Sequence, residues 1–318
     1  MTTSLPSPRG AALALLAAAI CLHSAPTAAQ QPATAVPAVS TPAPSAQGVT
    51  VEVVSPRIRR VVFANPPANL IGPETVARLH QVVRALEDDP SVQVVVFASS
   101  TPDFFFNHFD LAQAARFPSL PGDAQMPTWV DLVTRLSRAP FVSIAAIRGR
   151  TRGGGNELAL AMDLRYASRE HAYFSQPEVG TGIVPGGGGS ERLPRLVGRD
   201  RALEAILGSQ DYDAGTAERY GWITRALPDA QLDAFVMAMA ERLAGFDRAA
   251  LVAAKAQVDR ASLPPDADLA SAYREYSQSL ANPGLRPRLA RLGRFVAEKG
   301  LDVELRLGDY LGRIGPQP

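Results

Sequence analysis

Apolar residues change their spacing several times along the chain, and each change predicts a new structural element. Val51–Val54 and Arg60–Ala64 are rich in β-branched residues and are predicted to form two strands joined by a short turn. Between Pro73 and Asp89 the apolar residues recur at helical spacing, which predicts a helix with one buried face. Val92–Ala98 is almost wholly apolar, as expected of a strand that is covered on both faces.

Strands and helices continue to alternate after residue 140. Phe141–Ile147 is a further apolar run that predicts a buried strand. An Ala- and Leu-rich helix is predicted from about Gly154 to Met162, followed by short strands at Leu164–Ala167 and Ala172–Phe174. The repeating unit is strand, strand, helix, which predicts an α/β protein.

The second half of the chain is mainly helical in pattern, with one predicted strand at Trp222–Ala226. The helices predicted around this strand are Arg201–Leu207, Ala214–Tyr220, Asp229–Leu243 and Ala249–Val258. The tail from Asp268 to Gly312 keeps helical spacing and has exposed apolar positions. This favours packing of the tail against the body of the protein or against a neighbouring subunit.

The N-terminal segment differs in composition from the rest. Met1–Arg9 is polar with one positive charge, Ala11–Leu22 is apolar, and Thr27-Ala28-Ala29 offers small residues spaced as a signal peptidase requires. We therefore predict a signal peptide over residues 1–29 and export to the periplasm. The alternative is a misassigned start codon and a cytoplasmic protein. Residues 30–48 are rich in Ala and Pro and are predicted to form a disordered linker.

Composition narrows the chemistry that the folded part can perform. The chain has 32 basic and 31 acidic residues, and this near neutrality gives no reason to expect nucleic acid or a membrane surface as a partner. The only cysteine, Cys21, precedes the folded part, which therefore has no thiol nucleophile. The histidines show no ligand spacing, so no metal is expected. Carboxylates, hydroxyls, histidines and backbone amides remain as candidates.

Two linked motifs carry a family resemblance. They are IAAIRGRTRGGGNELALAMDLRYAS from residue 144 and FSQPEVGTGIVPGGGGSERLPRLVG from residue 174. They closely resemble the crotonase (enoyl-CoA hydratase/isomerase) superfamily pattern of a triple glycine with a following Glu, a Gln-Pro-Glu and a Gly-Ile-x-Pro-Gly turn. The resemblance implies an α/β, crotonase-like spiral of ββα units over residues 49–259. It also implies a C-terminal helical trimerisation region over residues 260–318, and hence a homotrimer or hexamer.

The same resemblance implies the substrate and the groups that bind it. The substrate would be an acyl-CoA thioester, with coenzyme A as part of the substrate and no separate cofactor. The backbone N–H groups of Phe109 and Gly154 would bind the thioester oxygen as an oxyanion hole, which stabilises an enolate without reorganising during the reaction. Gly153 and Gly155 would let the backbone and the ligand approach closely, because no Cβ intervenes.

Glu157 and Glu178 are the predicted catalytic pair. Glu157 follows Gly154 by about one helical turn, which places its carboxylate on the side of the oxyanion hole. Glu178 is predicted on a separate loop that is fixed by Pro177, which is also a candidate substrate-binding residue. Two neighbouring carboxylates push their pKa values apart, so one can act as a base while the other stays protonated.

The oxyanion loop departs from the family pattern. The sequence Asn107-His108-Phe109-Asp110 stands where relatives commonly have Ala-Gly-Ala-Asp. Phe109 either fills acyl space or packs beneath the loop, and Asp110 is a candidate substrate-binding residue. His108 is interpreted as structural or solvated, because the sequence identifies no partner for it.

The coenzyme A contacts also depart from the family pattern. Ala112 stands where relatives often carry a lysine, so arginines are predicted to bind the phosphates. Arg59 is the chosen candidate, with Arg57 and Arg60 beside it.

Three functions remain open at this point. The leading hypothesis is a lyase that adds water across the double bond of a 2-enoyl-CoA thioester. A double-bond isomerase would use one Glu as a proton shuttle, and a non-catalytic acyl-thioester-binding protein would keep only the fold. The two retained carboxylates argue against the last hypothesis.

Overall fold

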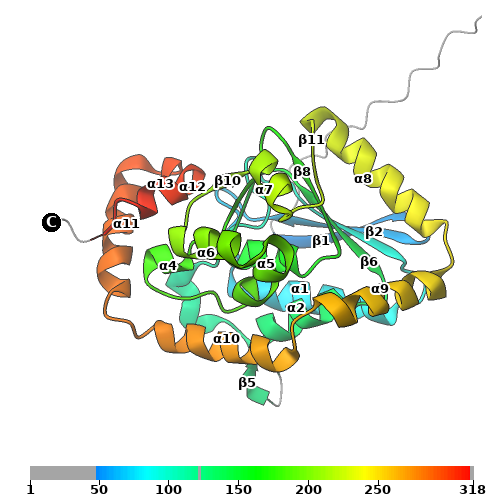
Figure 1. Ribbon diagram of the computed structural model, residues 1–318, viewed down its shortest axis with the longest axis horizontal. Coiled ribbons are helices and arrows are strands. Elements are labelled where there is room, and N and C mark those ends of the chain that lie inside the picture. The colour runs from blue at the N-terminus through cyan, green and yellow to red at the C-terminus, as the bar shows by residue number, and fades with distance from the viewer. Residues whose placement is uncertain (1–47, 121–122, 316–318) are drawn as a thin grey trace, which may run out of the picture. The chain divides into compact units, whose positions relative to one another are not determined.

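A computed structural model describes residues 48–120 and 123–315 of the chain. The predicted signal peptide and all but the last residue of the predicted linker lie outside them. A six-stranded sheet has the order β1-β2-β3-β6-β8-β11, with β1 antiparallel to β2 and all other neighbours parallel (Figure 1). Its strands are β1 (Gly48–Ser55), β2 (Ile58–Ala64), β3 (Val94–Ser99), β6 (Val142–Ile147), β8 (Leu164–Ser168) and β11 (Arg225–Leu227).

Successive turns of the chain contribute one strand to this sheet and one to a smaller sheet. β6 is followed by β7 (Arg150–Arg152) and helix α3 (Gly154–Leu160), and β8 is followed by β9 (Tyr173–Ser175) and helix α4 (Glu178–Thr181). β7 and β9 pair in parallel, and β10 (Tyr212–Asp213) completes the small sheet. The strand-strand-helix spiral predicted from the sequence is confirmed.

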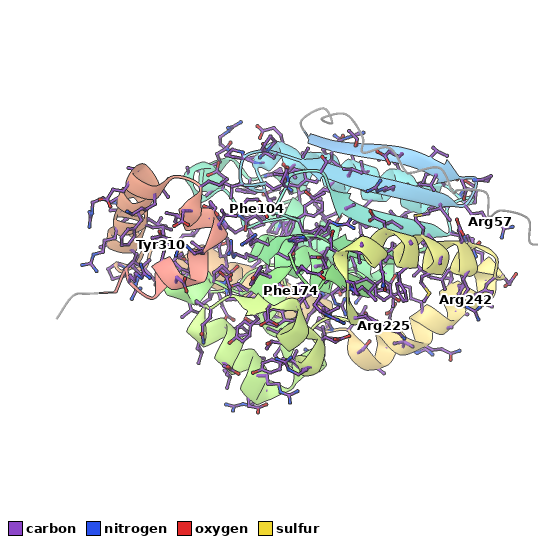
Figure 2. The ribbon with its side chains drawn as sticks, turned by 90° about the horizontal axis from the view of Figure 1, so that it is seen from above. Arg57, Phe104, Phe174, Arg225, Arg242 and Tyr310 are labelled. Carbon is purple, nitrogen blue, oxygen red and sulfur yellow. The ribbon has the colours of Figure 1, made fainter. Side chains whose placement is uncertain are left out.

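An apolar core lies on each face of the six-stranded sheet, as the apolar runs predicted. In β3, Val94 and Val96 pack against α8 (Asp229–Ala244), which lies over one face of the sheet (Figure 1). Val95 and Phe97 belong to the core on the other face, because successive side chains of a strand point in opposite directions. Figure 2 shows Phe174 of β9 in the interior of the molecule.

Helices cover the sheets and continue to the end of the described chain. Besides α3, α4 and α8, the α-helices before residue 265 are α1 (Pro73–Asp88), α2 (Thr128–Arg138), α5 (Gly189–Val197), α6 (Arg199–Gly208), α7 (Ala214–Tyr220) and α9 (Arg248–Ser262). The C-terminal helices are α10 (Asp266–Ser279), α11 (Leu285–Lys299), α12 (Asp302–Leu305) and α13 (Leu307–Leu311). α10 contacts α2 and α5, and α11 contacts α4. The C-terminal helical region is confirmed, whereas its part in a trimer stays a prediction. No helix of the described residues is long and apolar enough to cross a bilayer.

Several elements were not predicted from the sequence. Glu178 is the first residue of the short helix α4, so its predicted place on a loop was wrong. Helix α5 was missed because it begins in a run of glycines and contains Pro194, and both features disfavour helices. Burial of Leu193 and Val197 overrides these propensities. A 3₁₀ helix at Leu111–Arg116 and a small hairpin of β4 (Ser119–Leu120) and β5 (Asp123–Pro127) were also missed.

Candidate active site

Two backbone N–H groups are left free by the elements that contain them. Gly154 is the first residue of α3, where no carbonyl of the helix can reach its N–H. Phe109 forms a parallel bridge with Ile71. In this bridge the Ile71 N–H donates to the His108 carbonyl oxygen, and the Asp110 N–H donates to the Ile71 carbonyl oxygen. Neither the Gly154 N–H nor the Phe109 N–H makes a hydrogen bond within the described residues.

Phe109 and Gly154 line one cavity of about 70 Å³. Glu178 and Pro177 also line it, so four of the predicted site residues meet there. The other lining residues come from the oxyanion loop, from α4 and the residues that follow it, and from the C-terminal helices; they are His108, Leu111, Thr181, Ile183, Tyr276, Leu289, Leu292 and Leu307. The cavity is therefore mainly apolar, with one carboxyl group and one imidazole in its wall.

The Phe109 ring packs between other aromatic rings. Its centroid lies 4.7 Å from that of Phe117 and 4.8 Å from that of Trp129, and the contact with Trp129 is edge to face. The ring also covers Gly154, where a Cβ would lie 2.8 Å from its nearest atom. Both interpretations of Phe109 therefore hold in part, because the ring is packed beneath the loop and also forms cavity wall.

Gly153 and Gly155 bring the two halves of the site together. Gly153 has a φ of 48°, and a Cβ there would lie 2.9 Å from Oε1 of Glu178. A Cβ on Gly155 would lie 1.8 Å from the carbonyl oxygen of Phe106, whose neighbour Asn107 accepts the Gly155 N–H at 3.0 Å. Because no side chain fits at either position, the oxyanion loop and Glu178 can both lie against the start of α3.

A chain of side-chain hydrogen bonds holds Glu178. The Trp222 indole donates to Asn156 Oδ1 at 2.9 Å, Asn156 Nδ2 donates to Gln176 Oε1 at 2.6 Å, and Gln176 Nε2 donates to both Glu178 oxygens at 3.1 Å. Burial raises the pKa of Glu178 to about 8, and the negative charge of Glu157 adds to this rise. Glu178 is therefore protonated at neutral pH.

Glu157 is supported by backbone amides instead. Its side chain is buried, and Oε1 accepts the N–H of Gly187 at 2.7 Å and that of Gly189 at 3.1 Å. Burial raises the pKa of Glu157, although these two hydrogen bonds and the charge of Arg192 favour its ionised form. Arg192 donates to the carbonyl of Gly187 at 3.2 Å, so it supports the same turn. The Trp129 side chain also favours the ionised form of Glu157.

The two carboxyl groups are neighbours with different electrostatic surroundings. The charge of Glu157 contributes to the raised pKa of Glu178, which shows that they interact electrostatically. The amide donors and Arg192 favour the ionised form of Glu157, whereas burial and the charge of Glu157 favour the protonated form of Glu178. Glu157 is not among the residues that line the cavity, whereas Glu178 is.

The two remaining predicted site residues lie outside this cavity wall. Asp110 accepts the N–H of Ala112 at 3.1 Å and Gln113 Nε2 at 2.7 Å, so it caps the 3₁₀ helix that follows the oxyanion loop. Arg59 lies in β2, where it binds Asp89 at 3.2 Å and Ser91 at 3.2 Å. These contacts occupy the Arg59 guanidinium in structural bonds.

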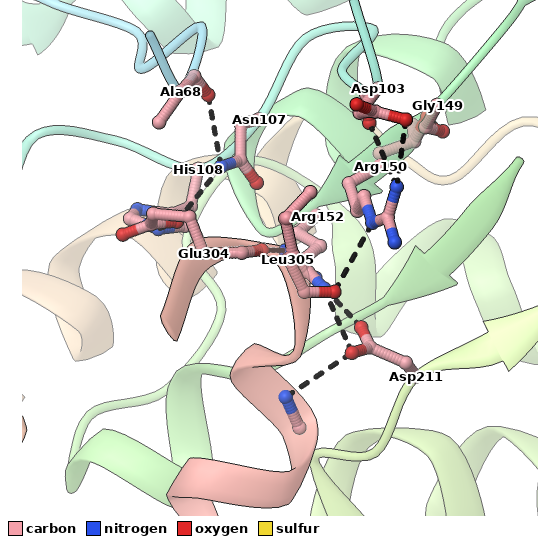
Figure 3. Close-up of polar contacts among 12 residues, drawn as sticks. Ala68, Asp103, Asn107, His108, Gly149, Arg150, Arg152, Asp211, Glu304 and Leu305 are labelled. Atoms are coloured by element: carbon pink, nitrogen blue, oxygen red, sulfur yellow. Dashed lines mark hydrogen bonds and ion pairs between the residues drawn. The ribbon is translucent and has the colours of Figure 1, made fainter. Parts of the chain in front are cut away.

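Sequence reasoning missed the partner of His108. Its Nε2 lies 3.0 Å from Oε2 of Glu304 in α12, which Figure 3 shows beside the oxyanion loop. The same oxygen accepts Asn107 Nδ2 at 3.0 Å. Glu304 lies in the C-terminal tail and belongs to no motif, so the sequence offered no signal for this contact.

An α/β spiral in which two free backbone amides and a partly buried carboxyl group share one cavity defines a protein of the crotonase fold. The family model for enoyl-CoA hydratase/isomerase matches residues 55–281. The chain therefore belongs to the enoyl-CoA hydratase/isomerase family of enzymes.

Individual relatives agree with this assignment. The chain is 30% identical to a short-chain-enoyl-CoA hydratase of Clostridium acetobutylicum, over 67% of this chain and 82% of that protein. It is 33% identical to a crotonyl-CoA hydratase of Syntrophomonas wolfei, over 58% of this chain and 71% of that protein. The crystal structure of a "putative enoyl-CoA hydratase" from Streptomyces avermitilis is 40% identical, covers 86% of this chain and 100% of its own, and has a TM-score of 0.80.

Proposed function

We propose that the protein adds water to the double bond of a short-chain 2-enoyl-CoA thioester. The observation that carries this proposal is the meeting of two unpaired N–H groups, of Phe109 and Gly154, with the Glu178 carboxyl group in one apolar cavity. The small, apolar cavity supports a short acyl group. The hydratases of Clostridium acetobutylicum and Syntrophomonas wolfei, to which the chain is similar, support a hydratase.

In the proposed reaction the thioester oxygen accepts hydrogen bonds from the N–H groups of Phe109 and Gly154. Glu157, the ionised carboxylate, takes a proton from water while the water oxygen bonds to the β-carbon. The electrons of the double bond move toward the thioester and form an enolate, which the two N–H groups stabilise. Glu178 then gives its proton to the α-carbon. Proton exchange through solvent restores both carboxyl groups, so the net reaction consumes one water.

Double-bond isomerisation is the second candidate, and one observation favours it. Glu178 lines the cavity and Glu157 does not, so a single carboxyl group stands where the substrate carbons would lie. A lone Glu178 could remove a proton from one carbon and return it to another without taking up water. Ionisation of Glu178 would then be required for the first step.

Incubation of the protein with crotonyl-CoA and 3-butenoyl-CoA in ¹⁸O-water separates the two candidates. We expect ¹⁸O at the β-carbon of the crotonyl-CoA product, detected by mass spectrometry. Conversion of 3-butenoyl-CoA to crotonyl-CoA without incorporation of ¹⁸O would instead establish an isomerase. The absence of both products with acyl chains of any length would leave a binding protein.

The remaining expectations concern the whole protein. A homotrimer or hexamer, an acyl-CoA substrate and export behind a signal peptide remain proposals that the resemblance or the N-terminal sequence supports. Sedimentation of the purified protein and N-terminal sequencing from its own host are the measurements that decide assembly and export.

A further inference from the structure

His108 lines the cavity, yet the proposed reaction does not use it. Its Nδ1 lies 2.9 Å from the carbonyl oxygen of Phe109, and its Nε2 lies 3.0 Å from Oε2 of Glu304. A carbonyl oxygen and a carboxylate oxygen both accept hydrogen bonds. The ring must therefore donate from both nitrogens, which only the imidazolium form can do.

The Glu304 oxygen is a pure acceptor in this contact. It receives Asn107 Nδ2 at 3.0 Å in addition to His108, and Asn107 Nδ2 must donate because it is also bound to the carbonyl of Ala68 at 3.1 Å. Burial opposes ionisation of Glu304, but His108, Arg152 and Asn107 outweigh burial and lower the pKa of Glu304 to about 2. Glu304 and His108 thus form a charged pair.

A buried arginine fixes the helix that supplies Glu304. Arg152 is fully buried and binds both carboxylate oxygens of Asp211, at 2.7 and 2.8 Å (Figure 3). It also donates to the main-chain carbonyl of Glu304, and Asp211 accepts the N–H of Gly308 at 3.2 Å. Since a bidentate arginine–carboxylate pair has a defined geometry, α12 is held in one position against β7.

His108 stands close to the groups proposed to react. Its Cβ would lie 3.3 Å from a Cβ on Gly153, which would itself lie 2.9 Å from Oε1 of Glu178. The carbonyl of His108 belongs to the same peptide group as the Phe109 N–H, and Ile71 donates to that carbonyl at 3.0 Å. His108 is thus placed to act on both Glu178 and one oxyanion donor.

We propose that Glu304 and His108 are a positioning pair of the active site, in which Glu304 keeps His108 charged and fixed beside Glu178 and the Phe109 N–H. This inference rests on the proposed function for its catalytic part. The imidazolium adds positive charge where the enolate forms. It also favours the ionised form of Glu178, so it helps this acid to release its proton.

Burial and the neighbouring ionisable groups shift the pKa values of His108, Glu178 and Tyr276. Burial alone would lower the pKa of His108, but the Glu304 carboxylate and its hydrogen bond outweigh burial and raise it, while Arg152 opposes the rise. Glu178 is influenced by Glu157, which raises its pKa, and by His108, which lowers it. Tyr276, from α10, shares the cavity wall, and burial raises its pKa above the ordinary value, so it stays neutral.

The test is the pH dependence of crotonyl-CoA hydration in the full-length Glu304→Gln variant. Loss of the negative charge leaves His108 neutral, so Glu178 holds its proton more strongly. We expect the alkaline limb of the kcat profile to move to higher pH, and kcat at pH 7 to fall by up to about 100-fold with little change in KM. Glu304→Asp keeps the negative charge, so the alkaline limb of its kcat profile should lie close to the wild-type position.

Glu298→Gln is the matched control, because it removes the same charge from an exposed position of α11. It should leave kcat and both limbs at their wild-type values. A Glu304→Gln enzyme with wild-type kcat and an unmoved alkaline limb overturns the inference, while the proposed function stands. A lower kcat with an unmoved limb reduces Glu304 to a structural residue and also overturns it. If Glu304→Gln does not fold, His108→Gln takes its place with the same expected shift.

A titration of His108 tests the His108–Glu304 pair without measuring catalysis, so the pair and the proposed function can fail independently. NMR of ¹³Cε1-labelled histidine follows the four histidines of the chain, and His108→Gln identifies the His108 signal. We expect His108 to titrate above the ordinary histidine value in the wild type and below it in Glu304→Gln. An ordinary titration in the wild type refutes the pair. A raised pKa in a protein that neither hydrates nor isomerises retains the pair and refutes the proposed function.

Discussion

The surroundings of the two candidate catalytic carboxyl groups are built in different ways. Glu157 accepts hydrogen bonds from two backbone N–H groups of the turn at residues 187–189. Arg192 donates to the carbonyl oxygen of Gly187 in the same turn. Glu178 receives a backbone N–H only from its own residue, together with the Gln176 side chain, and it lines the cavity. Backbone amides and a cation favour a carboxylate, whereas burial beside another negative charge favours a neutral acid.

This difference supports the roles proposed for the two groups. Glu157 is buried and Glu178 is partly buried, and desolvation favours the protonated form of each. The amides and Arg192 at Glu157 break this symmetry, and the resulting charge helps to keep the proton on Glu178. A single proton shared unequally by the two carboxyl groups would supply the base and the acid of the proposed hydration at the same pH.

Removal of either carboxyl group is expected to have the largest effect on activity. Glu157→Gln and Glu178→Gln should each lower kcat for crotonyl-CoA hydration by about 10²- to 10⁴-fold, the usual contribution of a general acid or base. Circular dichroism should show an intact fold in both. The two variants should differ in exchange of the α-protons of butyryl-CoA with D₂O, which needs Glu178 but not Glu157. Equal loss of exchange in both variants would contradict the division of roles.

Gln176, which donates to Glu178, and Arg192, whose charge acts on Glu157, can be substituted separately. Gln176→Leu deletes the donor to Glu178, whose pKa that hydrogen bond lowers, so the alkaline limb of the kcat/KM profile should move to higher pH. Arg192→Met deletes the charge that lowers the pKa of Glu157, so the acid limb should move to higher pH instead. Each variant should lose up to about 100-fold in kcat. A shift of the same limb in both variants would show that the supports are not separate.

The wild-type pH profile tests the protonation of Glu178 directly. Because Glu178 must carry a proton to give to the α-carbon, kcat/KM for hydration should fall as pH rises through about 8. One pH unit higher, it should be lower by about tenfold. Stopped assays across pH 6 to 10, with a check that the protein stays folded, measure this limb. An isomerase that uses ionised Glu178 as its base would gain activity over the same range.

The smallest expected effect concerns stability. The pKa of Glu304 is lowered from an ordinary 4.5 to about 2, so its contribution to folding is present above about pH 4.5 and is lost as pH falls toward about 2. His108, with its raised pKa, contributes below about 6.5 and loses this contribution as pH rises through its folded value. Glu304→Gln should therefore lower Tm most near pH 5 to 6. A Tm difference that persists unchanged at pH 2.5 would contradict this.

Much of the fold followed from local pattern. The strand at Phe141–Ile147 and the helix at Ala214–Tyr220 could be predicted because apolar spacing reports which faces are buried. Helix α5 could not, because burial of Leu193 and Val197 outweighs the helix-disfavouring Gly and Pro. Trp222 and Asn156 support Glu178 through side-chain contacts that no periodicity encodes.

Some residues of the candidate site could be predicted from the sequence and others could not. Gly154 and Phe109 could be placed by resemblance, and both line the cavity. Glu304 could not be found, because its contact with His108 joins residues 196 positions apart and depends on how the tail docks.

The docking of the C-terminal helices has a consequence for protein engineering. Leu289, Leu292 and Leu307 form part of the wall of the candidate active-site cavity, although they lie more than a hundred residues after Glu178. Chimeras that exchange this tail between relatives would thus transplant chain-length preference along with it. Saturation libraries aimed at longer substrates should begin at these three leucines rather than at the glycine-rich motif.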